Sequence, residues 1–236
     1  MQLFISFEGG ECTGKTTQSE LLRDRLLELG HRCVLVHEPG GTALGDRLRG
    51  LIKGELPITY EAELFLFSAA RTELVSKVIK PSLDKGIIVI TDRYVDSTTA
   101  YQGYGRRLDL SDIKSINTFS TQGILPDLTI LLDMPPEDAL KRLASLQVEL
   151  SLGVDSQTPQ GRVDHQGQRK FEKEKLEFHR RVRKGYLTLA KEDPHRWMVV
   201  DAGQPSEVVS KTIRERVEAM ISGVGSPTQS PDAGPA

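Results

Sequence analysis

The sequence of 236 residues predicts an α/β fold in which a five-stranded parallel sheet is flanked by helices. Three observations predict it: short apolar runs that do not alternate, helical periodicity between them, and a glycine-rich loop after the first run. Non-alternating runs are typical of strands that are buried on both faces. The predicted strands are 3–7, 33–37, 87–91, 128–132 and 197–200.

Helices are expected between these strands, most clearly over 17–29, 62–83, 136–146 and 171–189. Strands that alternate with helices imply right-handed crossovers and a ligand site beyond the carboxyl ends of the strands. Acidic residues follow three of the strands, so we expect them near that edge; they are Asp92, Asp133 and Asp201.

The loop after the first predicted strand has the pattern G-x-x-x-x-G-K-T of a phosphate-binding P-loop, between a strand and a helix as this pattern requires. The predicted fold is therefore the three-layer P-loop NTPase fold. Backbone N–H groups and the helix N-terminus are expected to hold the phosphates of ATP. Lys15 is expected to reach the β- and γ-phosphates, and the Thr16 hydroxyl to bind Mg²⁺. The predicted ATP site comprises Gly9, Gly10, Glu11, Cys12, Thr13, Gly14, Lys15 and Thr16.

Composition and charge argue against several other classes of function. The formal net charge of −2 gives no reason to expect binding to nucleic acid or to an anionic membrane. No apolar stretch is long enough to span a bilayer, and the chain enters its first strand too early for a signal peptide. Cys12 and Cys33 form neither a metal-binding pattern nor a disulfide framework, which favours the cytoplasm. We expect one domain over 1–221 and a disordered tail over 222–236.

A second signal for phosphoryl transfer is the end of the third predicted strand. Asp92 would lie beside Mg²⁺, and Arg93 can bind a phosphate with two parallel hydrogen bonds. From the residues alone, an aspartate that caps the next helix and a surface arginine explain the same pair.

Two further segments are compatible with a nucleotide base and a close ligand. Phe67 and Arg71 are four residues apart, so a ring and a guanidinium on one helix face can hold a planar base. A core phenylalanine and a solvated arginine fit that spacing equally well. The segment Glu38-Pro39-Gly40-Gly41-Thr42 permits a tight turn with Thr42 as a helix cap, which an ordinary turn also explains.

Together these segments resemble thymidylate kinases of the bacterial type, from about residue 3 to about residue 220. The tyrosine-glutamine-glycine segment combined with a P-loop is the most specific part of the resemblance. The matching pieces are Phe7-Glu8-Gly9, Glu38-Pro39-Gly40-Gly41-Thr42, Phe67-Ser68-Ala69-Ala70-Arg71, Asp92-Arg93-Tyr94, Ser97, Ala100-Tyr101-Gln102-Gly103, Pro126-Asp127-Leu128-Thr129, Leu132-Asp133 and Val200-Asp201-Ala202.

The resemblance implies transfer of the ATP γ-phosphoryl to thymidine monophosphate (dTMP) in a Mg²⁺-dependent homodimer that serves dTTP synthesis. It also implies individual roles. Glu11 contacts the sugar hydroxyl, Arg93 the acceptor phosphate, Asp92 the metal region and Arg142 the adenine. Phe67 stacks on thymine, Arg71 bonds its exocyclic oxygen, and Tyr101 and Gln102 close the pocket, to which Glu38 and Ser97 also belong.

Cys12 stands where one subgroup of the family has a P-loop arginine, so the resemblance places the catalytic arginine on a mobile lid. The candidate lid is 153–170, with Arg162 and Arg169 as possible donors. Relatives usually have an Asp-Arg pair before the long helix, where this chain has Arg169-Lys170. His37 stands where many relatives have arginine.

Other functions have less support in the sequence. A regulatory GTPase needs an Asn-Lys-x-Asp segment, but the only asparagine, Asn117, precedes Thr118. A deoxynucleoside kinase needs a strong general base at a neutral hydroxyl, whereas Arg93 suggests a charged acceptor. A kinase for another nucleoside monophosphate and a non-catalytic nucleotide-binding relative remain as alternatives.

Overall fold

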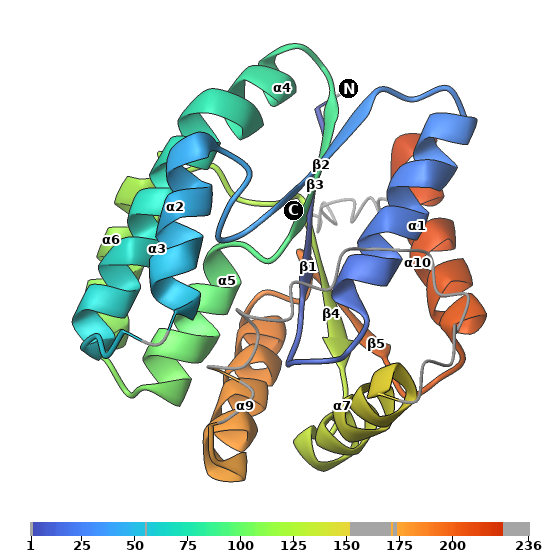
Figure 1. Cartoon of the computed structure of the whole chain (residues 1–236). Helices are drawn as coiled ribbons and strands as arrows, with labels where there is room; N and C mark the ends of the chain where they lie inside the picture. The colour runs from blue at the N-terminus through green and yellow to red at the C-terminus, as the bar shows by residue number, and fades with distance from the viewer. Residues whose placement is uncertain (1, 55, 152–170, 172–173, 224–236) are drawn as a thin grey trace, which may run out of the picture.

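A computed structural model describes residues 2–54, 56–151, 171 and 174–223, and in them five strands form one parallel sheet. The strands are β1 (Phe4–Glu8), β2 (Cys33–His37), β3 (Ile88–Asp92), β4 (Leu128–Asp133) and β5 (Trp197–Asp201). Their order is β2-β3-β1-β4-β5, with β1 in the centre. Figure 1 shows helices on both faces of this sheet, which confirms the predicted three-layer α/β fold.

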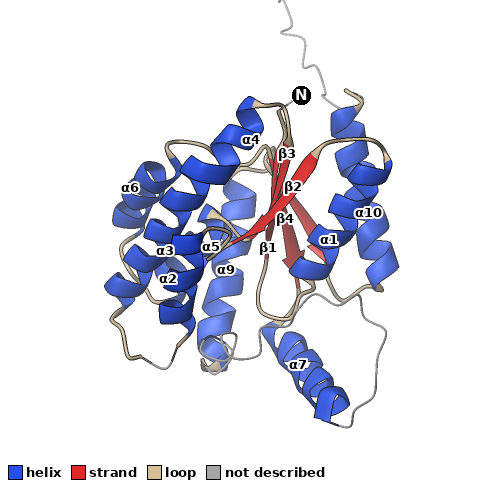
Figure 2. Cartoon of the chain, turned by 45° about the horizontal axis from the view of Figure 1, so that its top comes forward, coloured by secondary structure: helices blue, strands red, loops and turns tan. Residues whose placement is uncertain are grey.

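One face of the sheet is covered by α1 (Lys15–Glu28) and α10 (Ser206–Ile221), which pack against each other. Their buried stripes, including Leu22, Leu26 and Ile213, meet the isoleucines of the central strands. The opposite face is covered by α2 (Ala43–Lys53), α3 (Tyr60–Leu74), α4 (Lys80–Asp84), α5 (Val95–Thr98), α6 (Leu110–Thr121) and α9 (Leu176–Glu192). Figure 2 shows α7 (Pro136–Ser151) beyond the end of β4.

Strand register brings the acidic residues to one edge. Phe7 of β1 lies opposite Asp92, and Asp133 lies opposite Asp201. Each of the three aspartates is the last residue of its strand. The predicted ends of these three strands were therefore one residue too early. The carboxyl edge of the sheet therefore carries the predicted phosphate and metal region.

The predicted helix 62–83 is interrupted in the structure. α3 passes into a π-helical turn, η1 (Val75–Ile79), before α4 begins. Pro81 lacks an N–H to donate to the carbonyl of Lys77 and its ring crowds that carbonyl, which accounts for the wider turn. A second π-helical segment, η2 (Thr99–Gly105), follows α5 and carries the tyrosine-glutamine-glycine motif.

Other boundaries also differ from the predicted ones. α7 is longer than 136–146, and α9 begins at Leu176 and ends at Glu192 rather than spanning 171–189. α10 ends at Ile221, followed by a turn at 222–223. The remainder of the predicted tail, 224–236, and the candidate lid 153–170 lie outside the described residues.

Candidate active site

The P-loop between β1 and α1 requires glycine at two positions. A Cβ on Gly9 would lie 2.6 Å from the Leu132 carbonyl oxygen, so only glycine lets the loop pass β4. Gly14 caps α1 with φ 90°, in the left-handed region. The first turn of α1 contains no acidic side chain, so its N–H groups and positive dipole end are suited to an anion. The loop therefore has the predicted phosphate-binding geometry.

Lys15 lies across the mouth of this loop. Its Nζ donates to the Gly10 carbonyl oxygen at 2.6 Å, and the residue is 7% exposed. Burial, with help from the Arg93 guanidinium, lowers the pKa of Lys15. The ammonium is thus held at the loop without a carboxylate bonded to it, which leaves its charge for a bound phosphate.

Thr16 and Asp92 meet at the same end of the loop. The Thr16 Oγ1 donates to Asp92 Oδ2 at 2.5 Å on the exposed side of the site. Mg²⁺ prefers oxygen ligands, and at nucleotide sites it takes one or two from protein while phosphates and water supply the others. A hydroxyl and a carboxylate within reach of a P-loop fit that requirement, although the described residues contain no cluster of three His, Cys, Asp or Glu side chains that could hold a metal alone.

The Arg93 side chain forms hydrogen bonds through both terminal nitrogens of its guanidinium. Its Nη2 donates to Glu11 Oε1 at 2.9 Å and to the Tyr101 hydroxyl at 3.1 Å. Its Nη1 donates to the Gly9 carbonyl oxygen at 3.0 Å. The structure thus brings together Glu11, Arg93 and Tyr101, which the resemblance had assigned to acceptor binding.

Glu11 stays ionised because of these neighbours. Burial acts to raise its pKa, but Arg93 and then Lys15 outweigh burial and lower the pKa to about 2. The Glu11 carboxylate accepts one hydrogen bond from Arg93 and one from the Tyr101 hydroxyl. Glu11 therefore holds the guanidinium in place and offers an acceptor to a sugar hydroxyl.

Arg71 is not the solvated arginine that the spacing allowed. It is 1% exposed and forms an ion pair with Glu38, with Nη2 2.7 Å from Oε2 and Nε 2.9 Å from the same oxygen. Its Nη2 also donates to Thr98 Oγ1, and its Nη1 donates to Asn117 Oδ1. Arginine has five N–H donors, so these contacts leave little of the side chain for a base.

Aromatic side chains surround the predicted base pocket. Phe67 is half-buried, with its ring centroid 6.2 Å from that of Phe171. The Tyr101 ring lies edge-on to Phe171 at 5.7 Å and to Phe178 at 6.0 Å. Such a cluster offers flat apolar surface for stacking.

Gln102 is buried in the structure. It is 1% exposed, and its Nε2 donates to Glu63 Oε1 at 2.9 Å. The same Glu63 carboxylate is paired with Arg106, which also bonds Glu174 at 2.5 Å. Gln102 is therefore part of a buried network that joins α3 to η2, and its contact with substrate stays a prediction.

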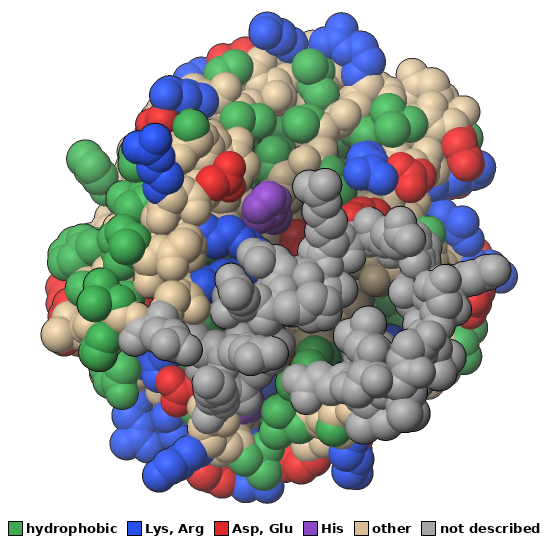
Figure 3. Space-filling view, in the orientation of Figure 1, with side chains coloured by type: hydrophobic (Ala, Val, Ile, Leu, Met, Phe, Trp, Pro, Cys, Tyr) green, Lys and Arg blue, Asp and Glu red, His purple; other side chains and the backbone are tan. Residues whose placement is uncertain are grey.

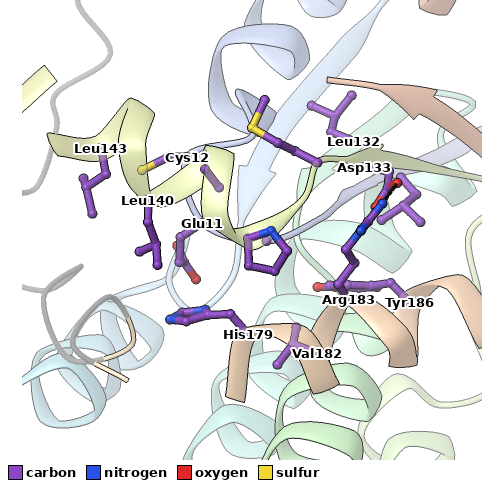
Figure 4. A pocket seen from close by; sticks show the side chains of 15 residues that line it. Glu11, Cys12, Leu132, Asp133, Leu140, Leu143, His179, Val182, Arg183 and Tyr186 are labelled. Atoms are coloured by element: carbon purple, nitrogen blue, oxygen red, sulfur yellow. Dashed lines mark hydrogen bonds and ion pairs between the residues drawn. The ribbon is translucent and has the colours of Figure 1, made fainter. Parts of the chain in front are cut away.

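A pocket opens between the P-loop, the end of β4, α7 and α9 (Figure 4). Glu11, Cys12 and His179 line it together with apolar side chains of α7. Arg183 closes one side through two 2.8 Å hydrogen bonds to Asp133. Burial lowers the pKa of His179.

Some predicted site residues are not brought into this cluster. Arg142 is exposed on α7, and Arg162 and Arg169 lie outside the described residues. The sequence interpretation also missed functional candidates, of which Glu8 and Tyr186 are the most important. Glu8 lies in the segment Phe7-Glu8-Gly9, and its place directly before the P-loop could have indicated a role. Nothing in the helical pattern of 171–189 distinguished Tyr186 from a core residue.

Comparison with known proteins identifies the group to which this site belongs. The family model described as thymidylate kinase matches residues 7–213. The chain belongs to the thymidylate kinase family. A thymidylate kinase of Dehalococcoides mccartyi is 45% identical over 94% of this chain and 98% of its own length, and one of Desulfovibrio desulfuricans is 44% identical over 93% and 96%.

A solved structure supports the same conclusion. The crystal structure of thymidylate kinase from Ehrlichia chaffeensis has a TM-score of 0.67 with this chain at 32% identity, covering 93% of this chain and 98% of its own. Thymidylate kinases are nucleoside monophosphate kinases, so the P-loop and the Arg93 cluster belong to a phosphotransferase.

Proposed function

We propose that this protein transfers the γ-phosphoryl group of ATP to dTMP, producing dTDP for dTTP synthesis. Family membership supports the reaction, and one observation carries the placement of its chemistry. Lys15 and Arg93 lie beside the P-loop, and the charges of both act on the Glu11 carboxylate. Phosphoryl transfer between two anionic nucleotides needs fixed cations where the phosphates approach each other.

On the donor side, Gly9 to Thr16 bind the ATP phosphates and Lys15 stabilises the migrating group. Mg²⁺ is bound through Thr16 and Asp92, whose oxygens already lie together. Arg142 extends from α7 into solvent, where it is free to lie against adenine. The lid arginine, Arg162 or Arg169, completes the charge around the phosphoryl group.

On the acceptor side, Arg93 binds the phosphate of dTMP and Glu11 the sugar hydroxyl. Phe67 stacks on thymine beside Tyr101. Glu38 acts through Arg71, because the ion pair fixes the guanidinium and leaves one N–H direction for the exocyclic oxygen. Ser97 and Gln102 support this pocket from behind through hydrogen bonds to Glu8 and Glu63.

The functional unit is a homodimer formed through α2, α3 and α6. Figure 3 shows hydrophobic side chains gathering at the left edge of the molecule, the side on which Figure 1 places these helices. Large apolar side chains are exposed there, among them Leu51 at 47%, Phe65 at 60% and Phe119 at 83%. Light scattering on the purified protein tests this, since a monomeric mass at micromolar concentration would contradict it.

The protein acts in the cytoplasm as one kinase domain. Neither Cys12 nor Cys33 forms a disulfide in the described residues, which is compatible with a reducing compartment. None of the helices in the described ranges is long and apolar enough to cross a bilayer.

The reaction is tested by ADP release with ATP, Mg²⁺ and each of dTMP, dUMP, UMP, CMP, AMP and GMP in turn. We expect kcat/KM to be highest with dTMP, by at least about tenfold. Faster turnover with another monophosphate would establish the alternative acceptor, and no turnover with any of them would establish a non-catalytic relative.

A further inference from the structure

Glu8 is a buried carboxylate at the end of β1, next to the P-loop. It is 0% exposed, and it accepts hydrogen bonds from the Tyr94 backbone N–H at 2.8 Å, Ser97 Oγ at 2.5 Å and the Tyr186 hydroxyl at 2.9 Å. Among the described residues no cation lies within ion-pair distance of it. A buried acid without an ion pair is costly, so its three donors have to hold it closely.

The hydrogens in this cluster can be counted. Ser97 Oγ and the Tyr186 hydroxyl lie 2.8 Å apart, and both face the same oxygen of Glu8. Each hydroxyl has one hydrogen and two lone pairs. When Glu8 is ionised, the two hydroxyl hydrogens have three contacts to serve, so one contact among the three oxygens has no hydrogen. Each hydroxyl oxygen keeps a lone pair that can accept from Arg93 Nη1, which lies 3.3 Å from each of them.

Arg93 is thereby held from two sides. Ser97, Tyr186 and the Gly9 carbonyl oxygen lie on Nη1, while Glu11 and Tyr101 lie on Nη2. Its backbone has φ 72°, a left-handed conformation that arginine rarely adopts, and the next N–H is the one bonded to Glu8. Surroundings that over-determine a disfavoured conformation are typical of a side chain that must be placed accurately.

We propose that Glu8 and Tyr186 are positioning residues, which with Ser97 set the angle at which the Arg93 guanidinium binds the acceptor phosphate. The inference rests on the proposed function, because it takes Arg93 as the ligand of that phosphate. It also gives α9 a part in acceptor binding, since Tyr186 reaches the site from a helix 178 residues beyond Glu8.

The same cluster makes acceptor binding sensitive to pH. Glu8 faces the Asp96 carboxylate of α5, the Arg93 and Arg71 guanidinium groups and the Tyr186 phenol. Burial, reinforced by Asp96, raises the pKa of Glu8 to about 7. A protonated Glu8 adds a third hydrogen, so that all three contacts among Glu8, Ser97 and Tyr186 carry one. The hold on Arg93, and with it the affinity for the acceptor phosphate, is therefore expected to change as pH passes through about 7.

The test compares the wild type with Tyr186→Phe, Glu8→Gln and the double variant. Tyr186→Phe keeps the ring that packs on Tyr101 and Trp197 and removes only the hydroxyl. In this variant we expect KM for dTMP to rise about tenfold at pH 8, because one hydrogen bond to a charged group is lost. KM for ATP is expected to stay within about twofold. Ser120→Ala, which removes a buried hydroxyl bonded to the Asn117 carbonyl oxygen of α6, is the matched control and leaves both constants unchanged.

Two further readouts separate positioning from loss of stability. In the double variant the effects are expected not to add, because both residues act through Arg93. The change of kcat/KM for dTMP between pH 8 and pH 6 is expected to be smaller in Glu8→Gln than in the wild type. Equal changes in both KM values, additive effects, or identical pH profiles would each overturn the inference.

Failure of the proposed function would look different. It would show as a wild type that does not turn over dTMP at all. In that case the readout is the affinity of the ADP-loaded protein for inorganic phosphate, measured by calorimetry, in place of KM for dTMP. A Tyr186→Phe variant that binds phosphate as tightly as the wild type would refute the positioning of Arg93.

Discussion

Thr16 and Asp92 are separated by 76 residues in the chain, yet the Thr16 hydroxyl lies 2.5 Å from the Asp92 carboxylate. Parallel pairing of β1 with β3 brings them together, because it places Phe7 opposite Asp92 and starts α1 at the same edge of the sheet. The contact joins the P-loop helix to the end of β3, which Arg93 follows directly. Two oxygen atoms on separate elements therefore lie together where the proposed function places a hydrated magnesium ion.

Asp92→Asn is expected to weaken Mg²⁺ binding more than folding. Loss of the charge should raise the Mg²⁺ concentration for half-maximal activity by about tenfold or more, and excess Mg²⁺ should restore part of the rate. Kinetics as a function of free Mg²⁺ measure this, with Asp24→Asn, an exposed change on α1, as control. An unchanged Mg²⁺ dependence would remove Asp92 from the metal site.

Lys15→Ala should abolish turnover while leaving the protein folded. Its ammonium is bonded to a backbone carbonyl oxygen rather than to a carboxylate, so little native structure depends on its charge. We expect kcat to fall by at least about a thousandfold, as for removal of a group that meets charge in the transition state. Thermal unfolding should shift only slightly, and near-normal kcat would contradict the phosphate assignment.

Arg71→Ala should act first on stability. Removing one partner of a buried ion pair leaves Glu38 without its cation, at a cost of about 3–5 kcal/mol of unfolding free energy. Urea unfolding measures this. Arg47→Ala, at an exposed position of α2, should change the same free energy by less than about 0.5 kcal/mol. If the two variants are equally stable, the ion pair of Arg71 with Glu38 does not stabilise the fold.

Glu8→Gln should change how stability depends on pH. The pKa of Glu8 is about 7 in the folded protein, against 4.5 for an ordinary glutamate. Between these values the folded protein binds this proton and the unfolded chain does not, so the contribution of the carboxyl is complete below pH 4.5 and is lost as pH rises to 7. Relative to the wild type, the variant should gain up to about 1.4 kcal/mol per pH unit across that window. A constant difference in unfolding free energy would refute the raised pKa.

Arg162→Ala and Arg169→Ala, made separately, should identify the lid arginine. The one that meets the migrating phosphoryl should lower kcat by at least about tenfold, with less effect on KM for dTMP. Single-turnover kinetics would show whether the loss is in chemistry. If neither variant lowers kcat, the charge comes from another part of the chain.

The sheet and the donor half of the site could be predicted from local sequence. The P-loop is contiguous, and the five apolar runs are short and clearly bounded, so strand positions were correct to within about one residue. Helix boundaries were less accurate because periodicity does not reveal where backbone hydrogen bonds change register, as they do before Pro81.

The acceptor half depended on contacts that no local pattern encodes. Arg71 could be read as solvated or as a base ligand, and only the fold shows that Glu38 and Asn117 bury it. Tyr186 has the spacing of a core residue on α9, and its hydroxyl gains significance only because β1 places Glu8 opposite it. Residues that act through long-range hydrogen bonds remain invisible until strands and helices are assembled.

The protein is expected to transfer the γ-phosphoryl group of ATP to dTMP rather than to water, while cations fixed beside the P-loop stabilise the charge. Incubating the protein with ATP labelled in the γ-phosphate, Mg²⁺ and dTMP, and separating the products by chromatography, tests it directly. The account predicts that the label moves to dTDP in a one-to-one ratio with ADP. Label recovered as inorganic phosphate, or left on ATP, would contradict it.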